Sequence, residues 1–119
     1  MVWANYDLSE SPKIIVTFED KILNDEDFYD FLKYWICIYE QKKDFTFVFD
    51  TTTIKQIPHI KYCIKMAIFI KNLKKLYKYH YLKQSTFIIN NKLIKNMLEF
   101  IFLIQPPVAP IVYELKIDN

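Results

Sequence analysis

A chain of 119 residues with 52% apolar and 18% aromatic side chains has enough apolar surface for one domain with a buried core, which excludes intrinsic disorder. It contains no glycine, and this excludes the P-loop, the dinucleotide-binding fingerprint and the nucleophile elbow, because each of these motifs needs glycine. The net charge of +2 is unevenly distributed: residues 1–50 carry 11 acids against 5 lysines (−6), and residues 51–119 carry 3 acids against 11 lysines (+8). This asymmetry indicates either an anionic partner or two halves that neutralise each other.

Cysteine usage, the amino-terminal residues and hydropathy predict a soluble, cytoplasmic protein. Cys37 and Cys63 fall in helical patterns, as in reduced intracellular proteins. Residues 1–13 lack the order of a signal peptide, and no stretch reaches the roughly 18 apolar residues that span a bilayer. We expect one domain over residues 1–119 with its core at about 13–115. Without glycine, backbone positions with positive φ are expected at Asn or Asp.

The first predicted elements are a buried strand and a long helix. Residues 13–18 (KIIVTF) form the apolar run of a buried strand, and residues 21–23 form a short extended segment after a turn. Asn24 is a suitable N-cap, and the acids that follow it suit the positive end of the helix dipole. The helix should run to about Gln41, with one apolar face formed by Phe28, Phe31, Leu32, Trp35 and Tyr39.

A central strand and a second helix are predicted next. Residues 45–50 (FTFVFD) are β-branched and aromatic, which is typical of a central strand. Pro58 is expected at the start of a helix from His59 to about Leu76, because its missing amide costs little in the first turn. The spacing predicts an inner face formed by Tyr62, Met66, Phe69, Leu73 and Leu76.

The last part of the chain repeats the strand–helix–strand pattern. Residues 85–90 (STFIIN) form a strand, and Asn90 or Asn91 caps a third helix that the double proline at 106–107 stops. Residues 110–115 (PIVYEL) are a last strand. The expected inner face of the third helix is Leu93, Ile94, Met97, Ile101 and Ile104.

This order, β-β-α-β-α-β-α-β, predicts an α/β fold. Strands that alternate with helices form a largely parallel sheet with right-handed crossovers. We therefore expect about five strands covered by three helices.

The sequence gives little support for a catalytic site or a metal site. His59 and Cys63 are four residues apart and would share a helix face, but a structural zinc needs four ligands and no second pair is visible. A catalytic triad could in principle be formed by Asp50, His59 and Ser85, but no local motif supports one. The structural alternatives are Cys63 as a small core residue and Asp50 as a cap for the following turn. We expect no enzyme, no metal and no cofactor.

The second helix carries a mixed surface opposite its core stripe. Ile60, Ile64 and Ile68 lie there among the lysines, which makes the surface less polar than a fully solvated one. It suits a protein partner or an anionic membrane, while the alternative is a solvated face beside the acidic first helix. Core-like aromatic spacing and a pI of 8.4 argue against nucleic acid. The lysines are Lys61, Lys65, Lys71, Lys74, Lys75 and Lys78.

The third helix has more apolar residues than one face can hold. Every position from Phe100 to Ile104 is apolar, so Phe102 and Leu103 are expected to point away from the core. A homodimer interface or a ligand groove that includes Phe100, Phe102 and Leu103 would explain this, and so would burial under the carboxyl-terminal tail.

Residues 47–73, FVFDTTTIKQIPHIKYCIKMAIFIKNL, resemble the switch region of STAS domains of the anti-sigma-factor antagonist type. In that family a strand ends in Asp, and a short loop leads to a helix whose start carries a phosphorylatable serine. Asp50 matches the strand-end acid, whereas the serine position falls on His59 and the acid before it on Pro58. The likeness covers about residues 13–115, and it implies a STAS-like fold whose phosphoacceptor is missing.

Residues 76–107, LYKYHYLKQSTFIINNKLIKNMLEFIFLIQPP, are similar to a segment of CRAL-TRIO lipid-binding domains. There a tyrosine-rich turn precedes a strand that ends in Asn, and a helix follows and closes with proline. This second resemblance implies a small lipid-binding module with its ligand beneath the third helix.

We expect a non-catalytic, STAS-like binding or regulatory module that acts through protein contacts, with the CRAL-TRIO-like lipid-binding module as the alternative. The contact surface would be the second helix and its preceding loop, residues 51–61. The residues assigned to partner binding are Asp50, Thr51, Thr52, Thr53, Pro58, His59, Lys61, Lys65 and Lys75.

Overall fold

Strands and helices alternate in the computed structural model, which describes residues 3–116. Asn24 caps the first helix as predicted, and its side-chain oxygen accepts a hydrogen bond from the Asp27 amide at 2.8 Å. The elements are β1 (Ala4–Asp7), β2 (Lys13–Phe18), α1 (Asp25–Glu40), β3 (Phe45–Asp50), α2 (Ile60–Leu76), β4 (Leu82–Ile89), α3 (Lys92–Ile104) and β5 (Ile111–Leu115).

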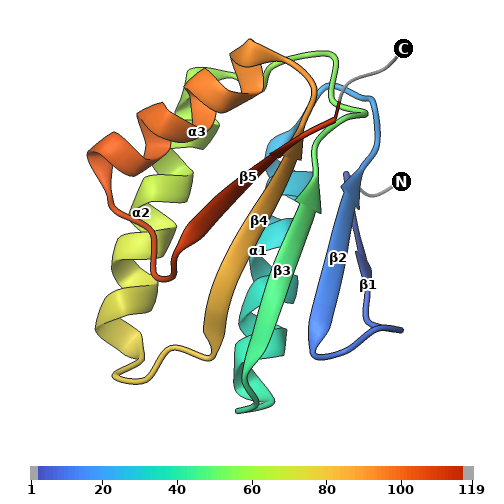
Figure 1. Ribbon diagram of the computed structural model, residues 1–119. Helices are drawn as coiled ribbons and strands as arrows, with labels where there is room; N and C mark the ends of the chain where they lie inside the picture. Colours follow the sequence, from blue (N-terminus) through green and yellow to red (C-terminus); the bar gives the residue numbers. More distant parts are fainter. Residues whose placement is uncertain (1–2, 117–119) are drawn as a thin grey trace.

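The strands form one sheet in the sequential order β1-β2-β3-β4-β5. β1 runs antiparallel to β2, and the other three neighbouring pairs are parallel. The α/β class, the mostly parallel five-stranded sheet and the three helices are therefore confirmed. Each crossover adds its next strand in the same direction across the sheet. Because crossovers of this kind are right-handed, the three helices lie on the same face (Figure 1).

The helix-covered face is packed with aromatic rings. Every second residue of β3 is buried. The Trp35 ring of α1 meets the Phe47 ring of β3 edge-on, with centroids 4.8 Å apart, and the Phe69 ring of α2 lies 5.5 Å from Trp35. On α3, the Phe102 ring lies 6.2 Å from Phe87 of β4. All three helices thus contribute to one aromatic core.

The opposite face of the sheet has no helix over it among the described residues (Figure 1). Ile15, Val48, Thr86 and Val112 are paired in register there, across β2, β3, β4 and β5. We call this surface the open face. Its members are Asn5, Asp7, Lys13, Ile15, Thr17, Thr46, Val48, Asp50, Gln84, Thr86, Ile88, Val112 and Glu114.

The strand predicted at 13–18 is confirmed as β2, whereas the short extended segment predicted at 21–23 is not a strand. Leu23 is instead buried in the core ahead of α1. The additional strand is β1, next to Trp3, whose ring lies 4.6 Å from Phe18 and 5.4 Å from Phe31. β1 has only four residues, which is too short for their alternation to stand out as a periodic signal. β4 also begins three residues earlier than predicted.

The inner faces of α2 and α3 need correction as well. Leu76, Leu93 and Ile104 were expected in the core but are 74%, 64% and 49% exposed, whereas Phe102, expected outside, packs on β4. The reason is that α2 is buried on two sides, against the sheet and α1 and against α3. The buried residues of the α2–α3 contact are Cys63, Ala67, Ile70 and Ile101.

None of the helices within residues 3–116 is long and apolar enough to cross a membrane.

The end of α1 shows how a chain without glycine stops a helix. Lys42 adopts a φ of 55°, in the left-handed region where glycine is usual just past a helix end. We expected Asn or Asp at such a position. The stop is set by the length of α1, whose last buried residue is Tyr39, and the chain offers only Gln41, Lys42 and Lys43 there.

Lys42→Gly should therefore stabilise the fold. Glycine adopts the left-handed conformation without the steric cost that a side chain adds, so the free energy of unfolding should rise by about 0.5–1 kcal/mol. Lys42→Val, which is β-branched, should lower it. Urea denaturation of the two variants and the parent measures both changes, and a less stable Lys42→Gly variant would contradict the assignment.

Candidate interaction surface

The loop between β3 and α2 is fixed to its neighbours by threonines. The Asp50 carboxylate accepts hydrogen bonds from the Thr52 amide at 3.0 Å and the Thr52 hydroxyl at 2.6 Å. Thr51 is buried, and its amide and hydroxyl both donate to the Ile88 carbonyl of β4. The Thr53 hydroxyl donates to the last carbonyl of β2 at 2.5 Å. Asp50 thus caps the turn, and the hydroxyls of all three threonines are engaged.

α2 begins one residue later than predicted. His59 is its N-cap, and the His59 Nδ1 accepts a hydrogen bond from the Lys61 amide at 3.1 Å. Pro58 lies before this cap instead of in the first turn, and it lines the interior. The ring nitrogen of His59 supplies the acceptor that an orphan first-turn amide needs, which is why the cap falls there.

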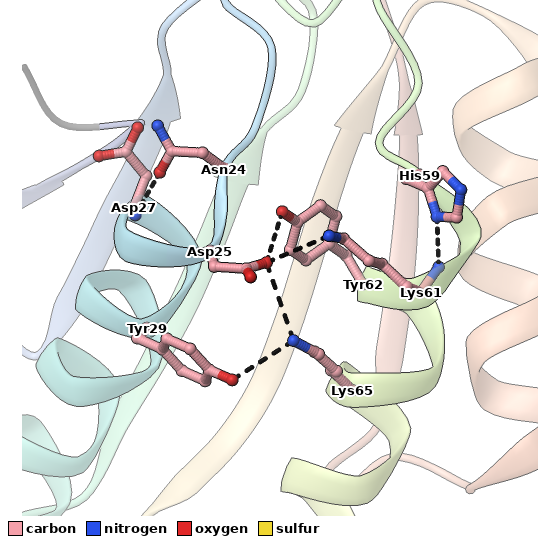
Figure 2. Close-up of polar contacts among 8 residues, drawn as sticks. All are labelled: Asn24, Asp25, Asp27, Tyr29, His59, Lys61, Tyr62 and Lys65. Carbon is pink, nitrogen blue, oxygen red and sulfur yellow. Dashed lines mark hydrogen bonds and ion pairs between the residues drawn. The ribbon is translucent and has the colours of Figure 1, made fainter.

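Lys61 and Lys65 turn toward α1, where they meet one carboxylate (Figure 2). Asp25 Oδ1 lies 3.4 Å from Lys61 Nζ and 3.8 Å from Lys65 Nζ, and it accepts a hydrogen bond from the Tyr62 hydroxyl at 2.8 Å. Lys65 also donates to the Tyr29 hydroxyl at 3.3 Å. The hydrogen bond from Tyr62, aided by Lys61, lowers the pKa of Asp25, and the bond to Tyr29 raises the pKa of Lys65. The acidic start of α1 therefore neutralises these two lysines.

The lysines in the second half of α2 are arranged differently. Lys71, Lys74 and Lys75 are exposed, and no ion pair joins any of them to an acid within residues 3–116. Helical spacing places Lys75 in line with Lys71 and Ile68, away from the α1 side. Three lysines without an acidic partner among residues 3–116 therefore lie close together in the second half of α2.

The outward side of α2 carries an apolar stripe. Ile60, Ile64 and Ile68 recur every fourth residue and are 56%, 44% and 52% exposed. On the helical wheel Ile60 and Ile64 lie next to Ala67, which packs against α3, and Ile68 lies farther from that contact. The first part of the stripe therefore borders the contact between the two helices.

α3 adds a set of exposed apolar residues on the other side of the contact between α2 and α3. Leu93, Phe100 and Ile104 lie next to Met97 and Ile101, through which α3 contacts α2. Leu93 and Ile104 were missed by the sequence analysis, which assigned them to the core. The α2–α3 apolar surface comprises Ile60, Ile64, Ile68, Leu93, Phe100, Leu103 and Ile104.

An apolar cavity of about 110 Å³ lies inside the domain, between the sheet and the helices. Met97, Ile101 and Phe102 of α3 line it, but Phe100 and Leu103 do not. Trp35 also lines it, and the buried Trp35 Nε1 has no hydrogen-bond acceptor. Of the three residues assigned to a groove or dimer interface, one therefore faces the interior and two face solvent.

The residues of the hypothetical triad are not brought together. Asp50 belongs to the open face, Ser85 is buried on the helix-covered face, and His59 caps α2. Within residues 3–116, no three His, Cys, Asp or Glu side chains gather in a way that would hold a metal ion. Cys63 packs in the core, where burial raises the pKa of its thiol. The second histidine, His80, lies 3.2 Å from the Tyr39 hydroxyl.

The fold and this surface define a two-layer α/β domain with an exposed apolar helix pair. No protein-family model matches the chain, and neither curated proteins nor solved structures gave a significant match.

The pKa of Asp25 tests the junction between α1 and α2. Tyr62→Phe removes the largest cause of its lowered pKa, so this pKa should rise toward its ordinary value of 3.8. Because the pKa is lower in the folded state, Asp25 stabilises the fold above its unfolded pKa, and this contribution is lost as the pH falls through the folded pKa. Carboxyl-carbon NMR titration measures the shift. Tyr29→Phe, which leaves the Tyr62 bond intact, is the matched control, and an unchanged Asp25 pKa in Tyr62→Phe would contradict the contact.

Proposed function

We propose that this chain is a non-catalytic binding or regulatory module of STAS-like topology that acts through protein contacts. The observation that carries this proposal is the α2–α3 apolar surface. Its seven members are between 37% and 83% exposed and lie along two adjacent helices. Contiguous apolar patches larger than a few hundred Å² are rare on soluble monomers and mark interaction sites.

The charges around the α2–α3 apolar surface indicate which kind of partner would fit it. Lys71, Lys74 and Lys75 extend the isoleucine stripe, and the chain has no acid between Asp50 and Glu99. A partner that fits would present an apolar ridge flanked by carboxylates, as an amphipathic acidic helix does. The apolar residues would supply affinity, and the lysines would steer association.

The β3–α2 loop supports the STAS-like reading. Asp50 ends a strand and caps a turn, and the helix that follows begins beside the proposed surface. His59 stands where the family has its serine, and its ring is used as a helix cap. The hydroxyls of the nearby threonines are engaged with backbone or Asp50. We infer regulation by occupancy of the surface instead of by phosphorylation of this loop.

The lipid-binding alternative depends on the interior cavity. That cavity lies beneath α3, as a CRAL-TRIO-like module would need, but its volume is about 110 Å³. Pockets for drug-sized ligands measure roughly 300–1,000 Å³. The exposed surface therefore supports a protein-binding role better than the cavity supports a lipid carrier.

Site-specific photo-crosslinking in extract of the source cells tests the surface. A photoreactive residue at position 64 should give one discrete adduct, and the same residue at position 34, on the far side of α1, should give none. Lys71→Glu combined with Lys75→Glu should lower the yield at position 64 by at least about tenfold, because two steering charges are reversed. Circular dichroism checks that the fold is retained.

Two outcomes would overturn this assignment. One is an adduct pattern that does not differ between positions 64 and 34. The other is sedimentation of the protein with phosphatidylserine vesicles that depends on Lys71 and Lys75, which would point to a membrane surface.

Native mass spectrometry of the purified protein tests the lipid alternative. We expect the mass of the bare polypeptide, as monomer or dimer, because the cavity is too small for a lipid. A co-purifying mass of several hundred daltons would contradict this, and loss of that mass in Met97→Trp, which fills the cavity, would locate the ligand there.

A further inference from the structure

The interior cavity is a second site, which the proposed function does not use. Its volume is about 110 Å³, and none of the seven residues of the α2–α3 apolar surface lines it. Ser85 lies between Phe47 and Ile111 in the sheet, and its small side chain leaves space on the helix-covered side. Cys63 of α2 and Ala109 ahead of β5 also line the cavity. Small residues from three parts of the chain thus leave room that the aromatic core does not fill.

One hydrogen-bond donor among the residues that line this cavity lacks an acceptor. Trp35 is 5% exposed, and no acceptor among the described residues pairs with its Nε1. Thr51 and Tyr62 line the cavity too, but their hydroxyls donate to the Ile88 carbonyl and the Asp25 carboxylate. A buried donor without a partner is costly and rare in native proteins. The Trp35 N–H is therefore available to an acceptor that enters the cavity.

The walls suit an apolar ring better than water or a charged molecule. A buried water typically makes about three hydrogen bonds, and the residues around this cavity are almost all apolar. An ionised ligand would lack a partner there. An apolar cavity of about 150 Å³ stays dry and binds benzene. The present cavity is somewhat smaller, so it suits a single ring of five or six atoms.

We propose that this cavity binds a small neutral ring compound with one hydrogen-bond acceptor, which accepts from Trp35 Nε1. Phe49 and Phe87 supply flat walls for the ring: they are stacked with centroids 4.9 Å apart, and Phe49 lies 5.9 Å from Trp35. Burial of the ring supplies the affinity. The Trp35 N–H supplies the selectivity, because it favours a heteroaromatic ring over a hydrocarbon of the same shape.

Pyridine and benzene are the probes, because the two rings match in size and only pyridine has an acceptor. Proton–nitrogen NMR of the full chain follows the indole N–H of Trp35 at mildly alkaline pH, where pyridine is uncharged. Pyridine should move this resonance downfield and saturate, as a new hydrogen bond does, whereas benzene should bind without the downfield shift. Absence of a saturable shift with pyridine would overturn the proposal, and so would the same shift with both rings.

Two substitutions on α3 test where the ring binds. Met97 lines the cavity, so Met97→Trp should fill it and abolish saturable binding of both rings. Leu93→Trp makes the same change at an exposed position of the same helix, and this matched control should bind both rings like the parent chain. Circular dichroism checks the fold of each variant. Equal binding by the two variants would place the ring outside the cavity and overturn the site.

Trp35→Phe tests the donor itself. Its loss of the N–H should weaken pyridine binding relative to benzene binding by about three- to tenfold, the net effect of one hydrogen bond. The ratio is used because a change in cavity size affects both rings. An unchanged ratio would contradict the role of Trp35. These results leave the proposed function unaffected, because it rests on the α2–α3 apolar surface, outside the cavity.

Discussion

The whole arrangement depends on one constraint: each strand after β2 is added at the same edge of the sheet by a crossover of the same hand. With the sequential order of the strands, this places α1, α2 and α3 in a single layer. Because successive side chains of a strand point to opposite faces of the sheet, apolar and polar residues are then separated between the two faces. Phe45, Phe47 and Phe49 of β3 enter the aromatic core, while Thr46, Val48 and Asp50 remain on the open face.

Placing three helices in one layer also determines the surface chemistry of that layer. α2 lies in the middle, so its two flanks are used by α1 and α3 and only a narrow arc faces outward. On the α1 flank, Asp25 neutralises Lys61 and Lys65. On the α3 flank, the outward arc is apolar, and Lys71 and Lys75 continue it. Of the two explanations for the charge asymmetry, neutralisation between the two halves is therefore seen over the first part of α2, at Asp25.

Periodicity and caps were enough to predict most of the fold. Asn24 and Asn91 cap helices, the double proline follows α3, and β3 has the predicted bounds. β1 was missed because it has only four residues and is held in place by tertiary contacts, among them Trp3 packing on Phe18 and Phe31.

The candidate site was less predictable from sequence. A helix with apolar residues on more than one side does not reveal which of them meets a neighbouring helix, so Leu93 and Ile104 were assigned to the core and Phe102 to the surface. The pairing of Lys61 and Lys65 with Asp25 joins residues about 40 positions apart. No local pattern encodes it. The most direct test of the one-layer arrangement is an intramolecular NOE map of methyl and aromatic protons. A single helix layer should give NOEs between Trp35 and Phe69 and between Phe102 and Phe87, whereas an NOE from any helix side chain to Val48 or Thr86 would contradict it.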